Sequence, residues 1–309
     1  MPPTRTSRPE LAEQSNMAIR FETREHCPVC GNIRAATLYQ APFSDPALKQ
    51  FIGSFYQDRA DLSVLKDAAY RVVKCRSCGF IYQANVLNDE GMTVLYGDWV
   101  NAEASLQKKQ NARAKLYRQY AGQMQTVSRL FPIIPGQVKV LEFGMGWGFW
   151  SRMAQAFGFR VEGLELSPER AEYASSLGVK VIDKLPEAGS HYHFIYANQV
   201  FEHLSNPLET LQQLQSRLTP DGVIYLRVPD GRGIEKTLAQ SGWSSDLDAI
   251  HPLEHINCFT RDSLCQLALG AGLVVFQPPL RLCLGSLWGG IKREYADRFL
   301  TTHVFFKNR

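Results

Sequence analysis

Residues 140–148 read Val-Leu-Glu-Phe-Gly-Met-Gly-Trp-Gly, a short apolar run that passes directly into three alternating glycines. The apolar part predicts a buried strand, and residues 149–157, which follow, have the composition of a helix. Glycines between a strand and a helix let the backbone approach a ligand closely, and the helix N-terminus offers it free N–H groups. This stretch therefore predicts a ligand-binding loop at the carboxyl end of a strand.

Short apolar strands alternate with helices throughout the sequence around this loop. Strands are predicted at 138–143, 160–166, 179–182, 193–197, 222–228 and 301–306. Helices are predicted at 147–157, 168–177 and 207–218. Such alternation predicts parallel strands joined by crossover helices. The expected fold class is therefore α/β, with a doubly wound, Rossmann-like sheet.

The composition limits the class of protein. The chain has 309 residues, of which 45% are hydrophobic and 21% charged, close to globular averages. The net charge is +4 and no run of five like charges occurs, so no nucleic-acid-binding face is expected. No apolar stretch reaches the roughly 18–20 residues of a membrane span, and the N-terminus lacks the apolar core of a signal peptide. A cytoplasmic protein without membrane contact is expected.

Two C-x-x-C pairs account for four of the seven cysteines, namely Cys27, Cys30, Cys75 and Cys78. The odd total argues against a fully paired disulfide framework. Four thiolates at about 2.3 Å satisfy the tetrahedral preference of Zn²⁺, and each pair is followed by a glycine, Gly31 or Gly79, suited to a tight turn. We therefore predict a structural zinc site, with an insertion at 43–69 between the pairs. Four reduced cysteines or a redox disulfide are the alternatives.

These features divide the chain into four parts. A polar tail with three prolines covers 1–20 and is expected to be disordered. The zinc-binding module covers 21–85, a helical connector or lid covers 86–135, and the α/β domain covers 136–309. The connector contains a predicted helix at 102–130, preceded by Tyr96 and Trp99. These two aromatic residues either close over a bound ligand or pack in the core.

The E-x-G-x-G-x-G pattern at 142–148 resembles motif I of class I S-adenosylmethionine-dependent methyltransferases. A nicotinamide-type fingerprint would need its third glycine at position 149, which is Phe. In the methyltransferases an acidic residue ends the second strand and binds the ribose hydroxyls, and Glu165 stands in that place. The resemblance implies S-adenosylmethionine as cofactor, bound by Glu142, Gly144, Gly146, Gly148, Glu165, Leu166, Asp183 and Asn198.

The resemblance continues downstream and covers most of the chain from about residue 75. Residues 199–207, Gln-Val-Phe-Glu-His-Leu-Ser-Asn-Pro, resemble the segment after strand four, and 218–229 resemble the following loop and strand. Glu202 and His203 in the first segment either line the methionine pocket or simply begin a helix. His193 stands where these enzymes usually have Asp, so we do not count it as a site residue.

Residues 251–260, His-Pro-Leu-Glu-His-Ile-Asn-Cys-Phe-Thr, place two imidazoles and a carboxylate within five residues. Their match to the H-x-x-E-H pattern of zinc hydrolases fails, because Pro252 is incompatible with the helix that pattern requires. The segment instead resembles one in methyltransferases with an N-terminal zinc-binding module, notably sugar C-methyltransferases. That resemblance implies catalytic roles for Glu254 and His255 beside the acceptor. Alternatively, His255 bridges the loop before a helix at Thr260.

The expected function is methyl transfer from S-adenosylmethionine to a small-molecule acceptor, with a nucleotide-linked sugar as one candidate. His255 is the candidate base, because an imidazole pKa near 6.5 suits proton transfer at neutral pH. The sugar C-methyltransferases have a further C-terminal domain, so O- or N-methylation of another small molecule, or of a protein, stays open. A non-catalytic zinc-containing binding protein with the same fold is the alternative of another class. Oligomeric state, and the choice between His255 and His203 as base, also stay open.

Overall fold

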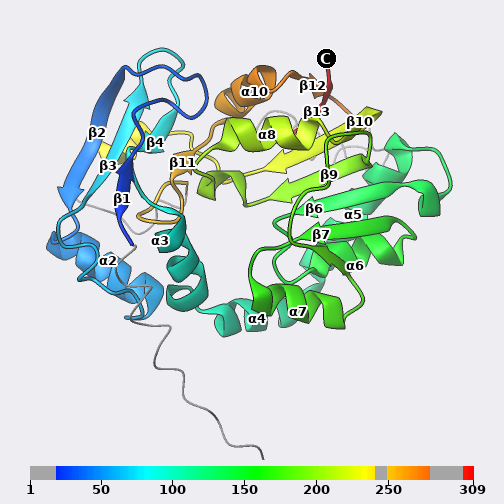
Figure 1. Cartoon of the computed structure of the whole chain (residues 1–309), viewed down its shortest axis with the longest axis horizontal. Coiled ribbons are helices and arrows are strands. Elements are labelled where there is room, and N and C mark those ends of the chain that lie inside the picture. The colour runs from blue at the N-terminus through cyan, green and yellow to red at the C-terminus, as the bar shows by residue number, and fades with distance from the viewer. Residues whose placement is uncertain (1–18, 241–248, 279–301) are drawn as a thin grey trace, which may run out of the picture.

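The computed structural model describes residues 19–240, 249–278 and 302–309 (Figure 1). Apart from Ile19 and Arg20, the predicted disordered tail lies outside these residues. Two groups of strands are connected by a helical segment, and the larger group has helices on both of its faces (Figure 1). None of the described helices is both long enough and apolar enough to cross a membrane.

The larger sheet has seven strands in the order β12-β13-β10-β9-β6-β7-β8. Strands β6 to β10 pair in parallel, and β13 lies antiparallel between β10 and β12. The bounds are β6 Lys139–Phe143, β7 Arg160–Leu164, β8 Lys180–Ile182, β9 Tyr192–Asn198, β10 Leu218–Arg227, β12 Leu273–Phe276 and β13 His303–Asn308. This mostly parallel sheet confirms the predicted α/β fold class, and its last strand extends two residues beyond the predicted end.

Helices cover both faces of this sheet because consecutive strand residues point to opposite sides. Val140 faces the layer of α5 (Ala114–Leu130) and α6 (Phe149–Ala156), where it packs with Met124 and Trp150. Leu141 faces the layer of α8 (Pro207–Gln215) and α10 (Arg261–Gly270), where it packs with residues such as Leu211 and Leu267. The helix α7 (Pro168–Ser176) packs near the β7–β8 edge through Ala174.

The sequence predicted one helix over 102–130, and the structure shows two, so this prediction is wrong. Helix α4, Ala102–Gln110, ends before α5 begins at Ala114. No residue of α4 is buried, whereas four residues of α5 are. Without an apolar face packed on the sheet, α4 is free to turn away from the direction of α5. A π-helix, η1 (Leu95–Trp99), and α3 (Asp89–Val94) precede α4.

The smaller sheet has the strand order β11-β4-β3-β2. Its strands are β2 Ala35–Pro42, β3 Ala69–Cys75, β4 Ile81–Gln83 and β11 Asn257–Cys258. Strand β1 (Phe21–Thr23) pairs separately with β5 (Asn85–Leu87). The predicted insertion holds α2, Pro46–Tyr56, whose N-cap Asp45 accepts hydrogen bonds from two backbone N–H groups. Strand β11 belongs to the long segment after β10, so this segment is built into the sheet of the N-terminal part.

One hydrophobic core joins the N-terminal part to the larger sheet. Cys27 and Phe80 pack in the same cluster as Phe201, Leu267 and Ile195. Phe80 also lies 4.9 Å from Phe259, measured between ring centroids. The cysteine pairs therefore support the segment that follows β10 through direct packing.

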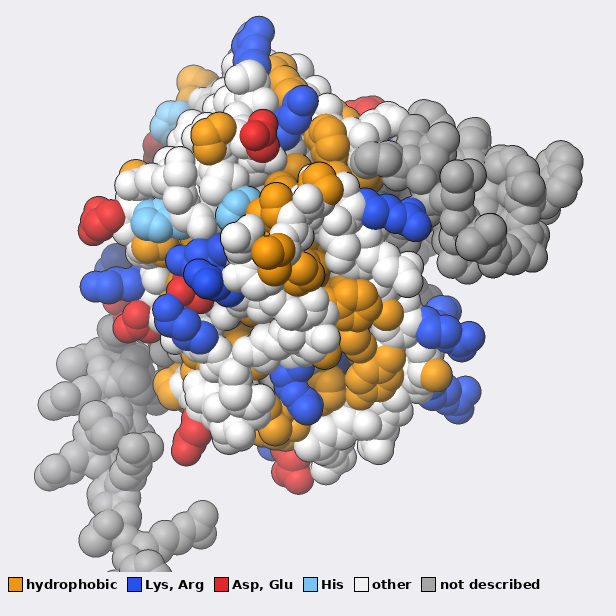
Figure 2. Space-filling view, turned by 90° about the vertical axis from the view of Figure 1, so that its right-hand side faces the viewer, with side chains coloured by type: hydrophobic (Ala, Val, Ile, Leu, Met, Phe, Trp, Pro, Cys, Tyr) orange, Lys and Arg blue, Asp and Glu red, His pale blue; other side chains and the backbone are white. Residues whose placement is uncertain are grey.

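The surface on the side of α5 and α6 is mixed in character. Hydrophobic side chains there lie among separate lysines and arginines (Figure 2). Ile133 and Ile134, just after α5, are 45% and 68% exposed.

Candidate active site

The glycine loop lies at the carboxyl end of β6, as predicted. Gly144, Gly146 and Gly148 have φ values of 69°, 56° and 71°, which residues other than glycine rarely adopt. A Cβ at Gly144 would lie 2.6 Å from Val200 Cγ2, whereas a Cβ at Gly146 would meet no atom within 4 Å. Gly146 therefore borders open space into which its backbone faces, and this fits a bound cofactor.

Glu165 follows β7 and reaches this loop. Its Oε2 accepts a hydrogen bond from Gly146 N at 2.8 Å, and its Oε1 accepts one from Ser167 N at 2.9 Å. The next residue, Leu166, is 77% exposed despite its apolar side chain. A carboxylate that can accept hydrogen bonds from ribose hydroxyls thus lies beside an apolar side chain on which an adenine ring can pack. This pair fits the nucleoside part of S-adenosylmethionine.

Two other predicted cofactor residues lie at the same edge of the sheet. Asp183 is exposed directly after β8, and Asn198 ends β9. The side-chain Oδ1 of Asn198 is buried and makes no hydrogen bond. A buried acceptor without a donor is costly, so a donor on a ligand is a natural partner for it.

Glu142 lies beneath the loop and is only 6% exposed. Its Oε2 accepts hydrogen bonds from Ser151 N at 2.9 Å and from Ser151 Oγ at 2.6 Å. These bonds tie the end of β6 to α6 and fix the start of that helix. Burial raises the pKa of Glu142 to about 8, although both hydrogen bonds oppose the rise. Glu142, which the sequence predicted as a cofactor-binding residue, thus directs its side-chain hydrogen bonds to Ser151 on α6.

The raised pKa of Glu142 predicts a pH-dependent stability. The folded pKa, about 8, lies above the ordinary 4.5, so the folded state binds more protons than the unfolded state between these values. The free energy of unfolding should therefore fall as pH rises through this window. Glu142→Gln, whose amide oxygen can still accept from Ser151, should flatten the decline. Urea unfolding of both proteins at pH 5 and pH 8 measures this, and equal slopes would contradict it.

Helix α4 covers the loop from the side of the connector. Trp147 Nε1 donates to Ser105 Oγ on α4 at 3.2 Å, and Gln110 Nε2 donates to Tyr173 OH on α7 at 3.4 Å. Partial burial lowers the pKa of Lys109 on α4, against the opposing effect of Glu142. Although α4 buries no residue fully, these two polar contacts connect it to the glycine loop and to α7.

The two aromatic residues before α4 have different positions. Trp99 is 3% exposed and packs in the core of the N-terminal part, as one of the two interpretations predicted. Tyr96 instead places its hydroxyl 2.9 Å from His203 Nδ1. Its side chain thus reaches a polar cluster beside the loop.

His203 is held by the segment that carries Glu254. Its Nδ1 lies 3.0 Å from the backbone oxygen of Glu254. Because a carbonyl oxygen only accepts hydrogen bonds, this contact assigns the proton to Nδ1 and the lone pair to Nε2. Nε2 lies 3.9 Å from Glu202 Oε1, and Glu202 is fully buried.

Three histidines meet at this point. The ring centroid of His255 lies 4.8 Å from that of His203 and 4.0 Å from that of His251. Burial, and then electrostatic interaction with the neighbouring His255, lowers the pKa of His203 to about 3 and that of His251 to about 2. His203 and His251 are therefore neutral at physiological pH.

Two carboxylates accompany His255. One oxygen of Glu202 and one nitrogen each of His203 and His255 lie within 4.8 Å of one another. Burial raises the pKa of Glu254 to about 7, opposed first by the Tyr56 hydroxyl and then by Arg170. The carboxyl of Glu254 can therefore bind or release a proton near neutral pH. The structure thus brings Glu254 and His255, predicted from the sequence, together with Glu202 and His203, whose role the sequence left open.

The sequence did not indicate three of the groups around this cluster. Tyr56 comes from the insertion between the cysteine pairs, Gln83 from β4 and Arg170 from α7. Arg170 lies 5.8 Å from the ring centroid of Trp147, on the loop side of the cluster. These residues are distant in sequence and match no motif, so no sequence signal identified them.

The four cysteines of the two pairs also come together. The sulfurs of Cys27 and Cys78 lie 3.6 Å apart, and so do those of Cys30 and Cys75. All four sulfurs lie within 4.8 Å of one another. Zinc bonds of about 2.3 Å in a tetrahedron would separate the sulfurs by about 3.8 Å, so the cluster fits a zinc ion. Gly31 and Gly79 have the predicted positive φ, at 71° and 75°.

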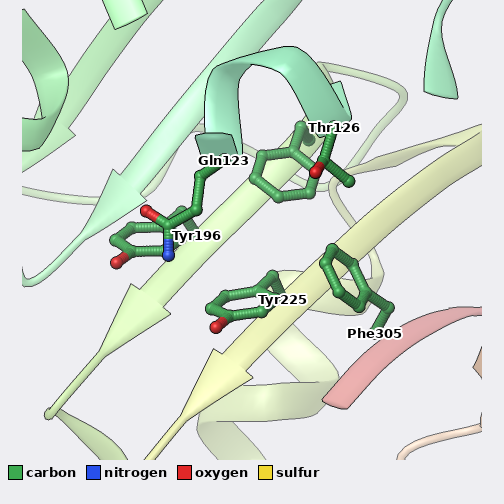
Figure 3. A pocket seen from close by; sticks show the side chains of 6 residues that line it. Gln123, Thr126, Tyr196, Tyr225 and Phe305 are labelled. Atoms are coloured by element: carbon green, nitrogen blue, oxygen red, sulfur yellow. The ribbon is translucent and has the colours of Figure 1, made fainter. Parts of the chain in front are cut away.

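A small cavity lies elsewhere, between α5 and strands β9, β10 and β13 (Figure 3). Its volume is about 10 Å³, so it holds one water at most. Tyr196 in its wall stacks on Trp150 at 4.1 Å and on Tyr225 at 5.4 Å between ring centroids. The cavity is a packing gap in the core and is too small for an acceptor.

Comparisons with known proteins agree with this architecture. A family model described as a methyltransferase domain matches residues 112–277, more than half of the chain. The chain is 28% identical over 145 residues to the C-methyltransferase NovU of Streptomyces niveus. That alignment covers 44% of this chain and spans only a third of NovU, 33% of its length.

Solved structures of methyltransferases are similar as well. The plantazolicin methyltransferase BpumL in complex with SAH has a TM-score of 0.48 and 18% identity, covering 70% of this chain and 93% of that one. A putative sarcosine dimethylglycine methyltransferase from Galdieria sulphuraria has a TM-score of 0.41 and 20% identity, covering 61% of this chain and 71% of that one.

Proposed function

Since the chain belongs to this family of methyltransferase domains, we propose that it transfers a methyl group from S-adenosylmethionine to a small-molecule acceptor. One observation carries the proposal. The open glycine loop with Glu165 lies beside a buried cluster of groups that can exchange a proton, in which His255 and Glu254 are central. A methyl donor and an acceptor proton would thus be handled at neighbouring positions at the carboxyl edge of one sheet.

The cofactor supplies an electrophilic methyl group on a sulfonium, whose leaving group departs neutral and needs no acid. The chain's own residues then have three tasks, which are to bind the cofactor, to align the acceptor with the methyl group and to deprotonate the acceptor. Gly146 and Glu165 would bind the cofactor, with Leu166 and Asp183 beside its adenosine part. Alignment of bound reactants contributes up to about 7–11 kcal/mol to lowering a barrier, and a positioned base contributes about 10²–10⁴-fold.

Glu165→Ala should weaken S-adenosylmethionine binding by about 1–3 kcal/mol, because it removes charge-assisted hydrogen bonds to the ribose. Isothermal titration calorimetry on the folded variant measures this change. Glu169→Ala on the neighbouring helix α7 is a matched control that removes an acidic residue outside the proposed contacts and should bind as wild type does. Unchanged affinity in Glu165→Ala would show that this carboxylate does not hold the ribose.

We assign the role of base to His255. The neutral state of His203 and His251 at physiological pH follows from their lowered pKa values, which make both imidazoles weak bases. One oxygen of Glu202 and one nitrogen of His255 lie within 4.8 Å of each other, so the carboxylate would stabilise the imidazolium that forms when His255 accepts a proton. Glu254, with a pKa of about 7, would orient the acceptor or exchange a proton with it.

The acceptor is a small molecule in this proposal, and a nucleotide-linked sugar is one candidate. The resemblance of 251–260 to sugar C-methyltransferases supports that candidate, and the name of the relative NovU as a C-methyltransferase supports methylation at carbon. A proton on carbon is removed only by a well-placed base in a site shielded from water, and the cluster around His255 is buried. O- and N-methylation place weaker demands on the base.

Zinc binding by the four cysteines is part of the proposal. Four thiolates close the coordination of zinc, so the ion would stabilise the fold and would not activate water. Cys27 and Cys75 belong to the core shared with the larger sheet, so an ion bound there would be coupled to the packing of both parts.

The experiment that tests the proposed function measures transfer of a labelled methyl group from S-adenosylmethionine. Purified protein is incubated with nucleotide-linked sugars and with fractionated metabolite extracts, and mass spectrometry identifies any product. We expect one class of small molecule to gain a single methyl group. Tight cofactor binding without transfer to any fraction would favour a non-catalytic binding protein.

A further inference from the structure

Arg24, three residues before Cys27, is surrounded by hydrogen-bond acceptors. Its Nε and Nη2 both donate to the backbone oxygen of Gln83, at 3.0 and 2.7 Å, and Nη2 also donates to that of Ile256 at 2.8 Å. Its Nη1 donates to Asn257 Oδ1 at 2.9 Å and to Ser205 O at 3.5 Å. The guanidinium thereby contacts three segments that are far apart in sequence.

Two of these segments carry the proton-exchanging cluster. Ile256 and Asn257 directly follow His255, and Ser205 follows the turn that carries Glu202 and His203. The third, Gln83, belongs to β4 of the N-terminal part. Figure 1 shows β11, which begins at Asn257, lying between β4 and the larger sheet. Arg24 therefore ties the N-terminal part to both elements of the cluster at once.

The neighbours of Arg24 extend this network to the backbone around the histidines. Gln83 Nε2 donates to the backbone oxygens of His251 at 2.6 Å and His255 at 2.9 Å. Asn257 Nδ2 donates to the backbone oxygens of Phe201 at 2.9 Å and Leu204 at 2.7 Å. Gln83 thus holds the backbone segment that carries His251 and His255, and Asn257 holds the segment that carries Glu202 and His203.

The segment before β11 depends on such contacts because regular structure does not hold it. Between His251 and Asn257 the only pairing among the described residues is a single bridge from His251 to His255. Leu253 in this segment has a φ of 73°, which is unfavourable for a residue with a side chain. The Gln83 side chain and the backbone hydrogen bond from Gln83 N to Ile256 O, at 2.9 Å, therefore help to hold the segment that carries His255.

We infer that Arg24 is a positioning residue for the acceptor side of the site. It holds the backbone around His255 and the turn of Glu202 and His203 in register, so that the base and its carboxylate face the acceptor. This inference rests on the proposed function. Burial lowers the pKa of Arg24 to about 9, so the side chain remains charged and able to donate at neutral pH.

Arg24→Lys and Arg24→Ala test this role, with Arg20→Ala as a matched control. The Arg20 side chain is 74% exposed and contacts Glu22 on the surface. Because a displacement of about 1 Å can cost about 10²-fold in rate, we expect kcat to fall about 10- to 100-fold in Arg24→Ala and less in Arg24→Lys. The dissociation constant of S-adenosylmethionine and the zinc content should stay within twofold of wild type. Arg20→Ala should leave all of these values unchanged.

Chemical rescue separates positioning from general stability. Millimolar methylguanidinium should restore part of the kcat of Arg24→Ala, and methylammonium should not, because only the planar guanidinium reaches several acceptors. A kcat near wild type in Arg24→Ala would overturn the inference. So would a loss of cofactor affinity in parallel with kcat, since Arg24 would then support the whole fold.

Hydrogen exchange provides a readout that does not depend on an acceptor. In Arg24→Lys we expect faster exchange of the amides in 201–205 and 251–257 and unchanged exchange in 144–148. Exchange that is unchanged everywhere, or faster in all three segments, would overturn the inference. If no acceptor is methylated by the wild type, the proposed function fails, while this measurement still decides the role of Arg24.

Discussion

His255→Ala should lower kcat by about 10²–10⁴-fold and leave the affinity for S-adenosylmethionine unchanged. The physical reason is that, in the proposed mechanism, His255 accepts the acceptor's proton in the transition state, while the proposed cofactor contacts are made by the glycine loop and Glu165. Single-turnover rates with saturating cofactor, together with calorimetry for cofactor binding, measure the two effects separately. Circular dichroism confirms that the variant is folded.

His251→Ala is the matched control for this prediction. His251 is buried beside His255, at 4.0 Å between ring centroids, and its lowered pKa excludes it as a base. Its replacement should therefore lower kcat far less than that of His255. If His255→Ala is folded, binds the cofactor and turns over within a few-fold of wild type, the base is elsewhere, and Glu202 with His203 becomes the pair to test.

Glu254→Gln extends the test to the pH dependence. The pKa of Glu254 is about 7, so its ionisation should appear in the pH profile of kcat/KM if the carboxylate takes part in the reaction. Activity that needs the carboxylate form falls as pH decreases through this value. The variant should lose that inflection, and an unchanged profile would show that Glu254 serves only through its backbone contact with His203.

Loss of zinc should have the largest effect on the fold. Zinc binding to a four-cysteine site is worth about 10–16 kcal/mol in small metal-dependent domains, and this free energy is coupled to folding. Cys27→Ser should reduce the zinc content from about one per chain and destabilise the N-terminal part. Because Cys27 shares a core with Phe201 and Ile195, the melting of the larger sheet should also occur at lower temperature.

Elemental analysis and thermal unfolding measure these two effects on the same samples. Cys265→Ser is the control, because Cys265 is partly buried on α10 and lies outside the cluster of four sulfurs. It should keep its zinc. If protein purified without chelators contains no zinc, or if Cys27→Ser keeps a full equivalent, the zinc proposal is wrong.

The sequence by itself determined the elements that local physics specifies. Strand β6 and its glycine loop follow from an apolar run and from backbone φ values that glycine adopts freely. Thr260, predicted as a helix start, caps α10 through a reciprocal pair of bonds with Ser263. The C-x-x-C spacing likewise indicated a four-cysteine cluster, because short turns place each pair of sulfurs together.

The same local reasoning failed where tertiary contacts determine the structure. The helix predicted over 102–130 is broken, because α4 has no packing partner to continue along α5. Periodicity records which residues are apolar and does not record which neighbour they face. The sequence also could not indicate the lowered pKa values of His203 and His251, since these depend on burial and on neighbouring side chains.

Only the tertiary structure decided how the acceptor side is assembled. Strand β11 pairs with β4, although more than 170 residues separate Asn257 from Tyr82 along the chain. Tyr56, Gln83 and Arg24 come to His255 and Glu254 from the N-terminal part through that pairing. Motifs are local, whereas buried hydrogen bonds are satisfied by whichever segment lies near in space, and the fold as a whole determines which segment that is.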